Sequence, residues 1–313
     1  MSELPRVIVL ILSYNGKELL YDSISSYLEN DYRNFEVVVI DNGSNDGTND
    51  YVKQNWKNVK LLRTDVNLKY SGGFNLGLEY AFEHENADYV LITNNDVKAD
   101  SKVISALVET AIKDSKIGFT TGKVFYFDQP EILQTVGKHE DPIRWNGSHI
   151  GAKEKDNGQF DSVSERIFID DVFTLVKRSV YEEVGGYDTI FEFQCEEWDW
   201  QARSKNAGFK MFYTPNAKIW HKESMTIGKQ SAFKAYYDAK NPPIVIARHQ
   251  NRKYFKKFIK SHIWSHVIKA SIKSILFEHN ISKAAKIISG LMDGLNLIKE
   301  QNINFKNDEA KNK

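Results

Sequence analysis

The first hundred residues alternate between short runs of apolar, mostly branched side chains and segments whose apolar residues have helical spacing. The strand-like runs are Val7 to Leu12, Val37 to Ile40, Val59 to Arg63 and Tyr89 to Thr93, and the helix-like segments are residues 18–29 and 75–84. Short apolar runs between polar turn residues are typical of parallel strands that are buried on both faces. The alternation therefore predicts an α/β fold with a doubly wound, mostly parallel central sheet flanked by helices, of which residues 1–100 form a nucleotide-binding half.

The later part of the chain follows other patterns. We expect residues 101–230 to complete the same domain, residues 231–301 to form a helical extension and residues 302–313 to be a disordered polar tail. Longer strand-like segments at 117–127 and 167–177 are separated by a polar stretch, Lys138 to Gln159, which predicts a long loop. Such a loop is either a functional lid or binding loop, or a surface excursion.

The cysteine content bears on the compartment. The chain has 313 residues and a single cysteine, Cys195, which excludes an internal disulfide framework and favours a reducing compartment. The first residues lack the form of a signal peptide, and no stretch reaches the roughly eighteen uninterrupted apolar residues of a membrane-spanning helix. We therefore expect a cytoplasmic protein.

The formal net charge is zero, but the charge is unevenly distributed. From Arg248 to Gly290 there are eight lysines and two arginines against one acid, Glu278, so this segment carries +9. Its apolar residues recur at helical spacing, so its helices either lie at the anionic inner face of the cell membrane as a peripheral contact, or pack on the α/β domain or on a second subunit as in a homodimer. Nucleic-acid binding is disfavoured, because no exposed platform of stacking aromatic residues is evident.

Polar residues at the ends of predicted strands are candidates for ligand contacts, because open α/β sheets bind ligands at their carboxyl edge. Asp41 opens a polar turn, where it either binds a base or ribose or only shapes the turn. Asp96, after Asn94 and Asn95, suits a divalent cation already ligated by substrate phosphates, although a helix-capping turn is the commoner explanation. His221 follows another strand-like segment, and neutral imidazole also binds divalent ions.

Two further segments lie where helices begin. In Ser71 to Gly77 the glycines permit close approach of a ligand or form a plain turn before a helix, but Phe74 stands where a dinucleotide-binding G-x-G-x-x-G motif needs glycine. Glu196, Glu197 and Asp199 begin another helix, whose dipole alone favours acids at that end. The chemical alternative is that one of them accepts a proton from an attacking hydroxyl.

In this order, the segments resemble family 2 of the inverting glycosyltransferases. The resemblance rests on Ser13-Tyr14-Asn15, Asp41-Asn42-Gly43-Ser44, Asn67 with Gly72 to Gly77, Asn94-Asn95-Asp96, Gly185 to Asp188, Glu196-Glu197-Trp198-Asp199 with Arg203, and Trp220-His221. It covers roughly residues 5 to 245 and looks most like rhamnosyltransferase-type enzymes of bacterial surface polysaccharide synthesis. It implies a GT-A fold, a nucleotide-sugar donor, a divalent metal (manganese or magnesium), and transfer of rhamnose or another hexose with inversion to a glycan or lipid-linked acceptor.

The resemblance also implies a role for each matched residue. Ser13, Asn15, Asp41, Asn67, Gly73, Asn75, Asn94 and Asn95 would border the nucleotide sugar. Asp96 and His221 would hold the metal on the diphosphate. Glu197 would be the general base, with Glu196 and Asp199 as alternatives.

Two positions depart from the family pattern. Asn94 stands where the metal motif often has Asp, and Glu197 stands where the acidic motif usually has Asp. The first departure is the one feature that favours a different function, a non-catalytic module that binds nucleotide sugars or glycans on the same fold.

Overall fold

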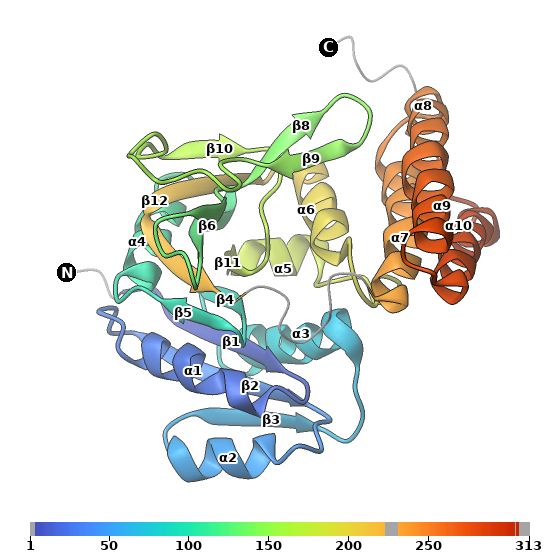
Figure 1. The fold of residues 1–313 in the computed structure, drawn as a ribbon. Coiled ribbons are helices and arrows are strands. Elements are labelled where there is room, and N and C mark those ends of the chain that lie inside the picture. The colour runs from blue at the N-terminus through green and yellow to red at the C-terminus, as the bar shows by residue number, and fades with distance from the viewer. Residues whose placement is uncertain (1–3, 223–230, 304, 307–313) are drawn as a thin grey trace.

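The computed structural model describes residues 4–222, 231–303, 305 and 306. Within this part of the chain, ten strands form one sheet in the order β10-β12-β6-β11-β4-β1-β2-β3, with β5 paired to β12 and β7 paired to β6 (Figure 1). The strands are β1 (Val7–Ser13), β2 (Phe35–Asn42), β3 (Lys60–Thr64), β4 (Tyr89–Asn94), β5 (Val97–Ala99), β6 (Ile117–Tyr126), β7 (Leu133–Thr135), β10 (Ser164–Arg166), β11 (Phe173–Lys177) and β12 (Lys210–His221). β3, β2, β1 and β4 are parallel neighbours, as are β6 and β12, whereas β11 runs antiparallel between β4 and β6.

Helices cover both faces of the sheet. The central strand β1 is apolar on both faces, and each face must be buried. Val7, Val9 and Ile11 pack into a core under α1 (Leu20–Leu28), α2 (Thr48–Asn55) and α4 (Val103–Ala111). The alternate residues Ile8 and Leu10 pack into a second core under α3 (Lys69–Glu79), α5 (Arg178–Val184) and α6 (Glu196–Asn206). The two cores confirm the predicted doubly wound sheet flanked by helices.

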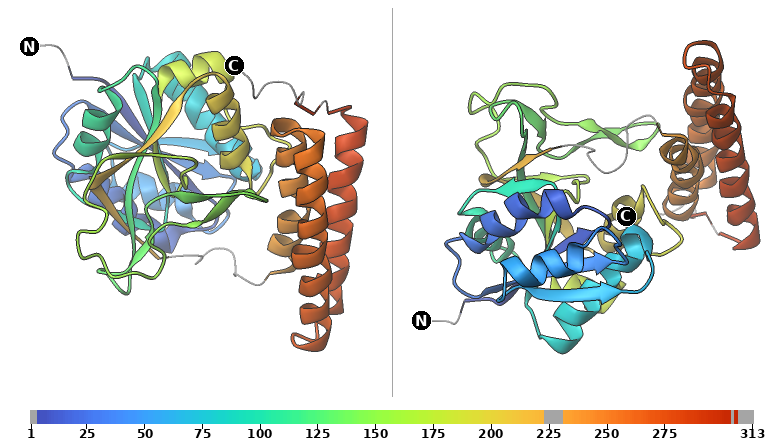
Figure 2. Two further views of the ribbon diagram at one scale, coloured as in Figure 1. Left: turned by 90° about the horizontal axis from the view of Figure 1, so that it is seen from above. Right: turned by 60° about the horizontal axis from the view of Figure 1, so that its bottom comes forward.

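The helical extension forms a bundle at one side of the α/β domain in both views of Figure 2. It comprises α7 (Ala232–His249), α8 (Arg252–His262), a π-helical turn η3 (Ile263–Ile268), α9 (Lys269–Leu276) and α10 (Ile281–Glu300). α10 crosses α7 closely, because a Cβ at Gly290 would lie 2.3 Å from the Tyr236 carbonyl oxygen and one at Gly294 would lie 2.4 Å from that of Lys240. Ile244 to Ile246 of α7 lie in the second core and so join the bundle to the domain.

Several predicted boundaries differ from the structure; of the strand predicted at 167–177, for example, only Phe173–Lys177 is a strand, β11. Part of the predicted loop 138–159 is an antiparallel hairpin, β8 (Lys138–Asp141) and β9 (Trp145–His149); its largely polar residues give no apolar alternation by which a strand is recognised. The predicted disordered tail begins too early, since Ile303 packs against the second core, the Phe305 ring lies 5.2 Å from that of Phe255, and Lys306 bonds to Asn206. Residues 304 and 307–313 lie outside the described residues.

Candidate active site

The carboxyl ends of three parallel strands meet at one edge of the sheet. Ser13 of β1 stands opposite Asp41 of β2, and Leu12 stands opposite Asn94 of β4. Hydrogen bonds then tie the following loops together, from the Asn15 amide to Ser44 Oγ (2.9 Å) and from Asn95 Nδ2 to Ser13 Oγ (3.3 Å). The structure thus brings Ser13, Asn15, Asp41, Asn94 and Asn95 to a single edge.

Asp41 shapes the turn that follows β2. Its side chain is fully buried; one oxygen accepts a hydrogen bond from the Ser44 amide (3.0 Å) and the other pairs with the Arg63 guanidinium. Arg63 also donates to the Ser44 carbonyl (3.0 Å), and its side chain remains 42% exposed. The pair therefore places a partly exposed cation at the sheet edge, which sequence reasoning missed because Arg63 lies inside a strand.

The glycine segment has a packing role that differs from the predicted one. Gly73 and Gly77 lie inside α3, which begins at Lys69, and not in a loop before it. A Cβ would lie 2.6 Å from Leu12 Cδ1 at Gly73 and 2.5 Å from Ile40 Cδ1 at Gly77, so both glycines let α3 approach the sheet closely. The expectation that this segment precedes a helix is therefore wrong, because the segment lies inside α3, whereas the predicted place of Gly73 beside the nucleotide stays a prediction.

Asn67 and Asn75 also form structural contacts. The Asn75 amide bonds to both backbone groups of Tyr187, donating to the carbonyl (2.8 Å) and accepting from the amide (2.9 Å). Asn67 Oδ1 accepts from Asn42 Nδ2 (3.1 Å) and from the Lys69 amide (2.8 Å), which keeps it beside the β2 edge. Asn75 therefore joins α3 to the turn around Tyr187, and its predicted place beside the nucleotide stays a prediction.

The two candidate metal ligands are adjacent. β5 pairs with the end of β12 so that Val97 stands opposite His221, and Asp96 Oδ1 lies 3.2 Å from His221 Nε2. The other ring nitrogen of His221, Nδ1, lies 2.8 Å from Gln134 Oε1, and Gln134 Nε2 donates to the His221 carbonyl, so Nε2 is the ring nitrogen that faces the carboxylate. A carboxylate oxygen and an imidazole nitrogen thus lie together at a mostly buried point, and both are ligand types that divalent cations accept.

A cluster of three carboxylates is connected through the backbone to the end of β4. Oxygens of Asp171, Glu196 and Glu197 all lie within 4.8 Å of one another. Val172, next to Asp171, accepts a hydrogen bond from the Asn94 amide (3.1 Å), which connects the cluster to the Asp96 loop. Sequence reasoning missed Asp171; the available signal was a pair of acids, at 170 and 171, just before an apolar strand.

The carboxylates of this cluster cannot all be ionised at once. Burial, followed by the nearby Asp171 carboxylate, raises the pKa of Glu197, and burial, followed by Glu197, raises that of Glu196. The Glu196 side chain is buried and its Oε2 has no hydrogen-bond partner among the residues that the structure describes, whereas Glu197 is half-buried and can meet a substrate from outside. A carboxyl group whose pKa is raised toward neutrality is suited to a general base.

This electrostatic coupling predicts the effect of Asp171→Asn. Removing the Asp171 charge is expected to lower the pKa of Glu197, so the acid limb of the transfer rate, kcat/KM against pH, should move to lower pH by about one unit or more. The matched control is Asp50→Asn on the exposed side of α2, for which the profile should not move. An unchanged limb, or one displaced to higher pH, in Asp171→Asn would contradict the coupling.

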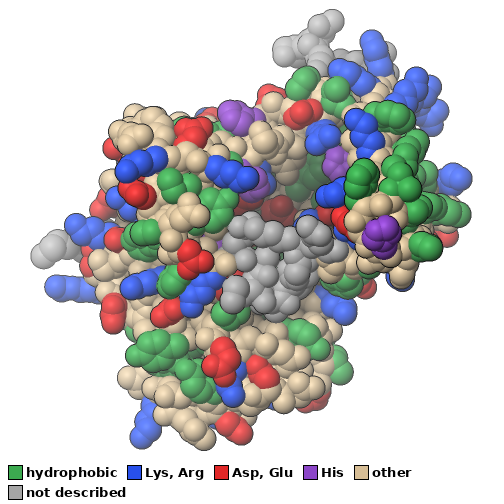
Figure 3. Space-filling model, in the orientation of Figure 1, with side chains coloured by type: hydrophobic (Ala, Val, Ile, Leu, Met, Phe, Trp, Pro, Cys, Tyr) green, Lys and Arg blue, Asp and Glu red, His purple; other side chains and the backbone are tan. Residues whose placement is uncertain are grey.

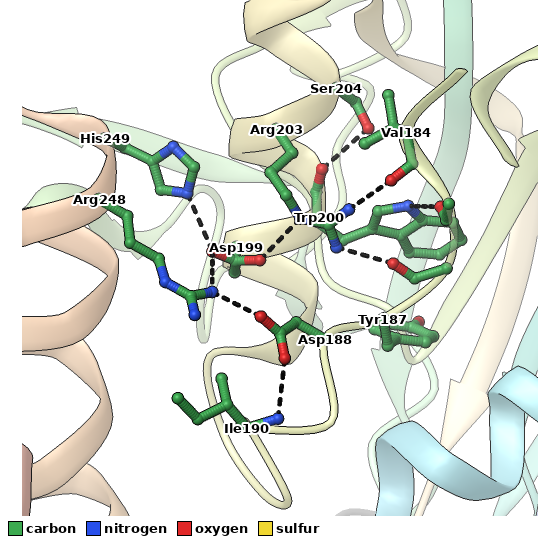
Figure 4. Close-up of polar contacts among 12 residues, drawn as sticks. Val184, Tyr187, Asp188, Ile190, Asp199, Trp200, Arg203, Ser204, Arg248 and His249 are labelled. Atoms are coloured by element: carbon green, nitrogen blue, oxygen red, sulfur yellow. Dashed lines mark hydrogen bonds and ion pairs between the residues drawn. The ribbon is translucent and has the colours of Figure 1, made fainter. Parts of the chain in front are cut away.

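Asp199 belongs to a different set of contacts, shown in Figure 4. It is fully buried, with Oδ2 2.8 Å from Arg203 Nε and Oδ1 2.9 Å from His249 Nε2. Arg248 lies 3.4 Å from the same Oδ1 and also pairs with Asp188 (2.7 Å). Although burial opposes ionisation, the hydrogen bond from His249 and the charge of Arg203 lower the pKa of Asp199. Asp199 thus joins α6 to α7, and this role replaces the alternative that it is the base.

The β8–β9 hairpin is anchored close to the carboxylate cluster. Asp170 pairs with Lys138 (2.7 Å) and His149 (3.1 Å), one on each strand of the hairpin. Trp145, at its turn, packs with ring centroids 4.8 Å from Phe168 and 6.3 Å from Trp198. The positive charge of Lys138 also opposes the rise in the pKa of Glu197. The hairpin therefore acts on the site in two ways: the charge of Lys138 affects Glu197, and Trp145 packs near the helix that carries Glu197.

Solved structures share this fold. The chain matches GalNAc-T7 crystallised with UDP, GalNAc and Mn2+ at a TM-score of 0.58 and 16% identity, over 89% of this chain and 59% of that one. It also matches the mannosyltransferase PcManGT of Pyrobaculum calidifontis, in complex with GDP-Man and Mn2+, at a TM-score of 0.58 and 14% identity, over 94% of this chain and 88% of that one. The fold is GT-A, as expected.

The sequence comparisons define the family. Residues 8–185, more than half of the chain, match the model of Glycosyl transferase family 2, and the chain belongs to this family. Relatives include the poly-beta-1,6-N-acetyl-D-glucosamine synthases of Staphylococcus aureus (strain COL), 27% identical over 232 residues, and of Staphylococcus epidermidis, 26% identical over 221 residues. These matches cover 73% and 70% of the chain but 52% and 50% of the relatives, so the chain spans about half of their length.

Proposed function

We propose that the protein is an inverting glycosyltransferase that moves a sugar from a nucleotide-diphosphate donor to a hydroxyl of a glycan or lipid-linked acceptor. The observation that carries this proposal is the backbone bond from Asn94 to Val172, which links the strand end that leads to the Asp96–His221 pair with the cluster that contains the half-buried Glu197. The first suits a cation that holds a diphosphate, and the second suits a base. Rhamnose or another hexose is the proposed sugar and the cytoplasm the proposed compartment.

The reaction is a single displacement. The acceptor hydroxyl oxygen attacks the anomeric carbon, its proton passes to Glu197, and the bond from that carbon to the diphosphate oxygen breaks with its electron pair leaving on the diphosphate. One displacement inverts the configuration at the anomeric carbon. Burial, followed by the charge of Glu197, raises the pKa of Glu196, so the two neighbouring carboxyl groups titrate together.

Asp96 and His221 would hold the divalent metal, and Gln134 orients the imidazole for it. When bound, the metal neutralises the charge that develops on the leaving diphosphate. Both solved neighbours were determined with Mn2+, which supports a divalent cation, and manganese or magnesium is proposed here. Ser13, Asn15 and Asn95 lie at the edge that Asp41 and Asn94 share, which supports the proposal that they border the nucleotide.

Donor binding tests this proposal. Calorimetric titration with UDP-, dTDP- and GDP-sugars, each with and without Mn2+, should give binding of one donor that depends on the metal. The matched control, Glu109→Ala on the exposed side of α4, should bind that donor as the wild type does. Absence of binding by every donor in the presence of Mn2+ would contradict the proposal.

A further inference from the structure

The helical bundle exposes a stripe of large apolar side chains. We define the stripe by Trp264, Ile268, Ile272, Ile275, Leu276 and Phe277, all of which are exposed. Trp264 is 57% exposed, Leu276 62% and Phe277 76%, values that are unusual for such large apolar groups on a packed helix. Figure 3 shows hydrophobic side chains gathered with Lys and Arg on the face of this bundle. Exposed apolar patches of this kind mark interaction sites.

The stripe is not the face by which the bundle packs on the rest of the chain. Phe258 of α8 is 2% exposed and lies in the second core, and Val267 is 7% exposed and packs with Ile287 of α10. These residues form the inner face of the same helices. Trp264, Ile268, Ile272 and Leu276 recur at intervals of four residues and are all exposed, whereas Phe258 and Val267 are buried, so the stripe lies on the solvent-exposed side of these helices.

Basic side chains flank the stripe. Lys260, Lys269 and Lys273 are exposed along the same helices, and Lys269 Nζ lies 5.4 Å from the centre of the Trp264 ring. The acid in this segment, Glu278, is occupied by Lys283 (2.8 Å) and Lys273 (3.6 Å). The surface around the stripe is therefore positive as well as apolar.

We propose that the stripe is a docking surface for an anionic lipid membrane, on which α9 and the preceding turn lie parallel to the surface. The stripe would enter the headgroup region, and the neighbouring lysines would bind anionic headgroups. Charge decides against a second copy of the chain, because two copies placed stripe to stripe would bring their lysines together, whereas anionic lipid neutralises them. No helix of the described residues has the length and apolar content to pass through a bilayer, so the contact is at the interface.

Co-sedimentation of the full chain with vesicles tests the proposal without any glycosyl transfer. The protein should bind vesicles of equal parts phosphatidylglycerol and phosphatidylcholine, and bind phosphatidylcholine vesicles at least about tenfold more weakly. Added salt should weaken the anionic binding. The triple variant Trp264→Ser, Ile272→Ser, Leu276→Ser should lose at least about tenfold in vesicle affinity, because these side chains supply the apolar part of the contact.

A matched triple variant controls for the loss of exposed apolar residues in general. Tyr21→Ser, Ile112→Ser and Val163→Ser change exposed positions on the α/β domain and should leave vesicle binding unchanged. A charge variant, Lys260→Gln with Lys269→Gln, should reduce binding to anionic vesicles while the stripe remains intact. Circular dichroism of each variant verifies that the helices are retained.

Two results would overturn the proposal. The first is wild-type protein that stays in solution with anionic vesicles at moderate salt, or that binds anionic and neutral vesicles equally. The second is a dimer, measured by light scattering, that the stripe variant converts to a monomer while vesicles capture neither form. The second result would assign the stripe to another copy of the chain.

Discussion

Glu197→Gln is expected to lower kcat for sugar transfer by about 10²- to 10⁴-fold, which is the range for loss of a general base. Gln keeps the size of the side chain but cannot accept the proton of the acceptor hydroxyl. Because Glu197 is separate from the Asp96–His221 pair, the variant should bind donor and metal as the wild type does. Initial rates of nucleoside diphosphate release, together with donor affinities from calorimetry, measure the two effects separately.

Two neighbouring acids serve as controls for this variant. Glu196→Gln should slow transfer less, because its buried side chain acts only through Glu197. Asp199→Ala should lower the melting temperature, since it leaves Arg203 and His249 without their shared carboxylate, and loss of one partner from a buried ion pair costs about 3–5 kcal/mol. A Glu197→Gln protein with the wild-type rate would exclude Glu197 as the base. A wild-type protein that binds donor but never transfers it would favour the non-catalytic module.

The sheet edge could be predicted from sequence because its signals are local. An apolar run that ends in Ser13, Asp41 or Asn94 marks where each strand ends, and parallel pairing then brings those ends together. Asp96 and His221 are 125 positions apart in sequence, yet each was found by the same local sign, a polar residue at a strand end. What the sequence did not give is their 3.2 Å separation, which depends on the pairing of β5 with β12.

The sequence was a poorer guide to Gly73, Asp171 and the acids of α6, because their surroundings depend on distant parts of the chain. Glycine has a low helix propensity and therefore indicated a loop at Gly73, but the close approach of α3 to Leu12 selects glycine inside the helix. Asp171 has only a weak local signal, a pair of acids before a strand, and its closeness to Glu196 and Glu197 depends on the tertiary fold. The acidic first turn of α6 likewise looked uniform, whereas the structure gives Glu196, Glu197 and Asp199 different exposure and different partners. Side-chain partners from distant elements decide these roles.

Asp96→Ala is expected to weaken metal-dependent donor binding by roughly 100-fold or more, because it removes the only carboxylate of the Asp96–His221 pair. Its effect should appear in the Mn2+ titration of donor affinity and leave any metal-independent binding of the nucleotide unchanged. The pair makes a further distinction possible. Gln134→Ala keeps both proposed ligands but removes the hydrogen-bond partner, 2.8 Å away, that orients the imidazole of His221. We therefore expect metal-dependent donor affinity to fall by only about tenfold in this variant.

The order in which these variants lose metal-dependent donor affinity is the decisive result, because it distinguishes a metal site from a buried ion pair. If Asp96 and His221 bind a metal, Asp96→Ala and His221→Ala should each abolish the response of donor affinity to Mn2+, with Gln134→Ala in between those variants and the wild type. If the pair is only structural, the same variants should lower the melting temperature and leave the Mn2+ response intact. A response to Mn2+ that survives both substitutions would move the metal to other residues, of which the Asp171, Glu196 and Glu197 cluster is the next candidate.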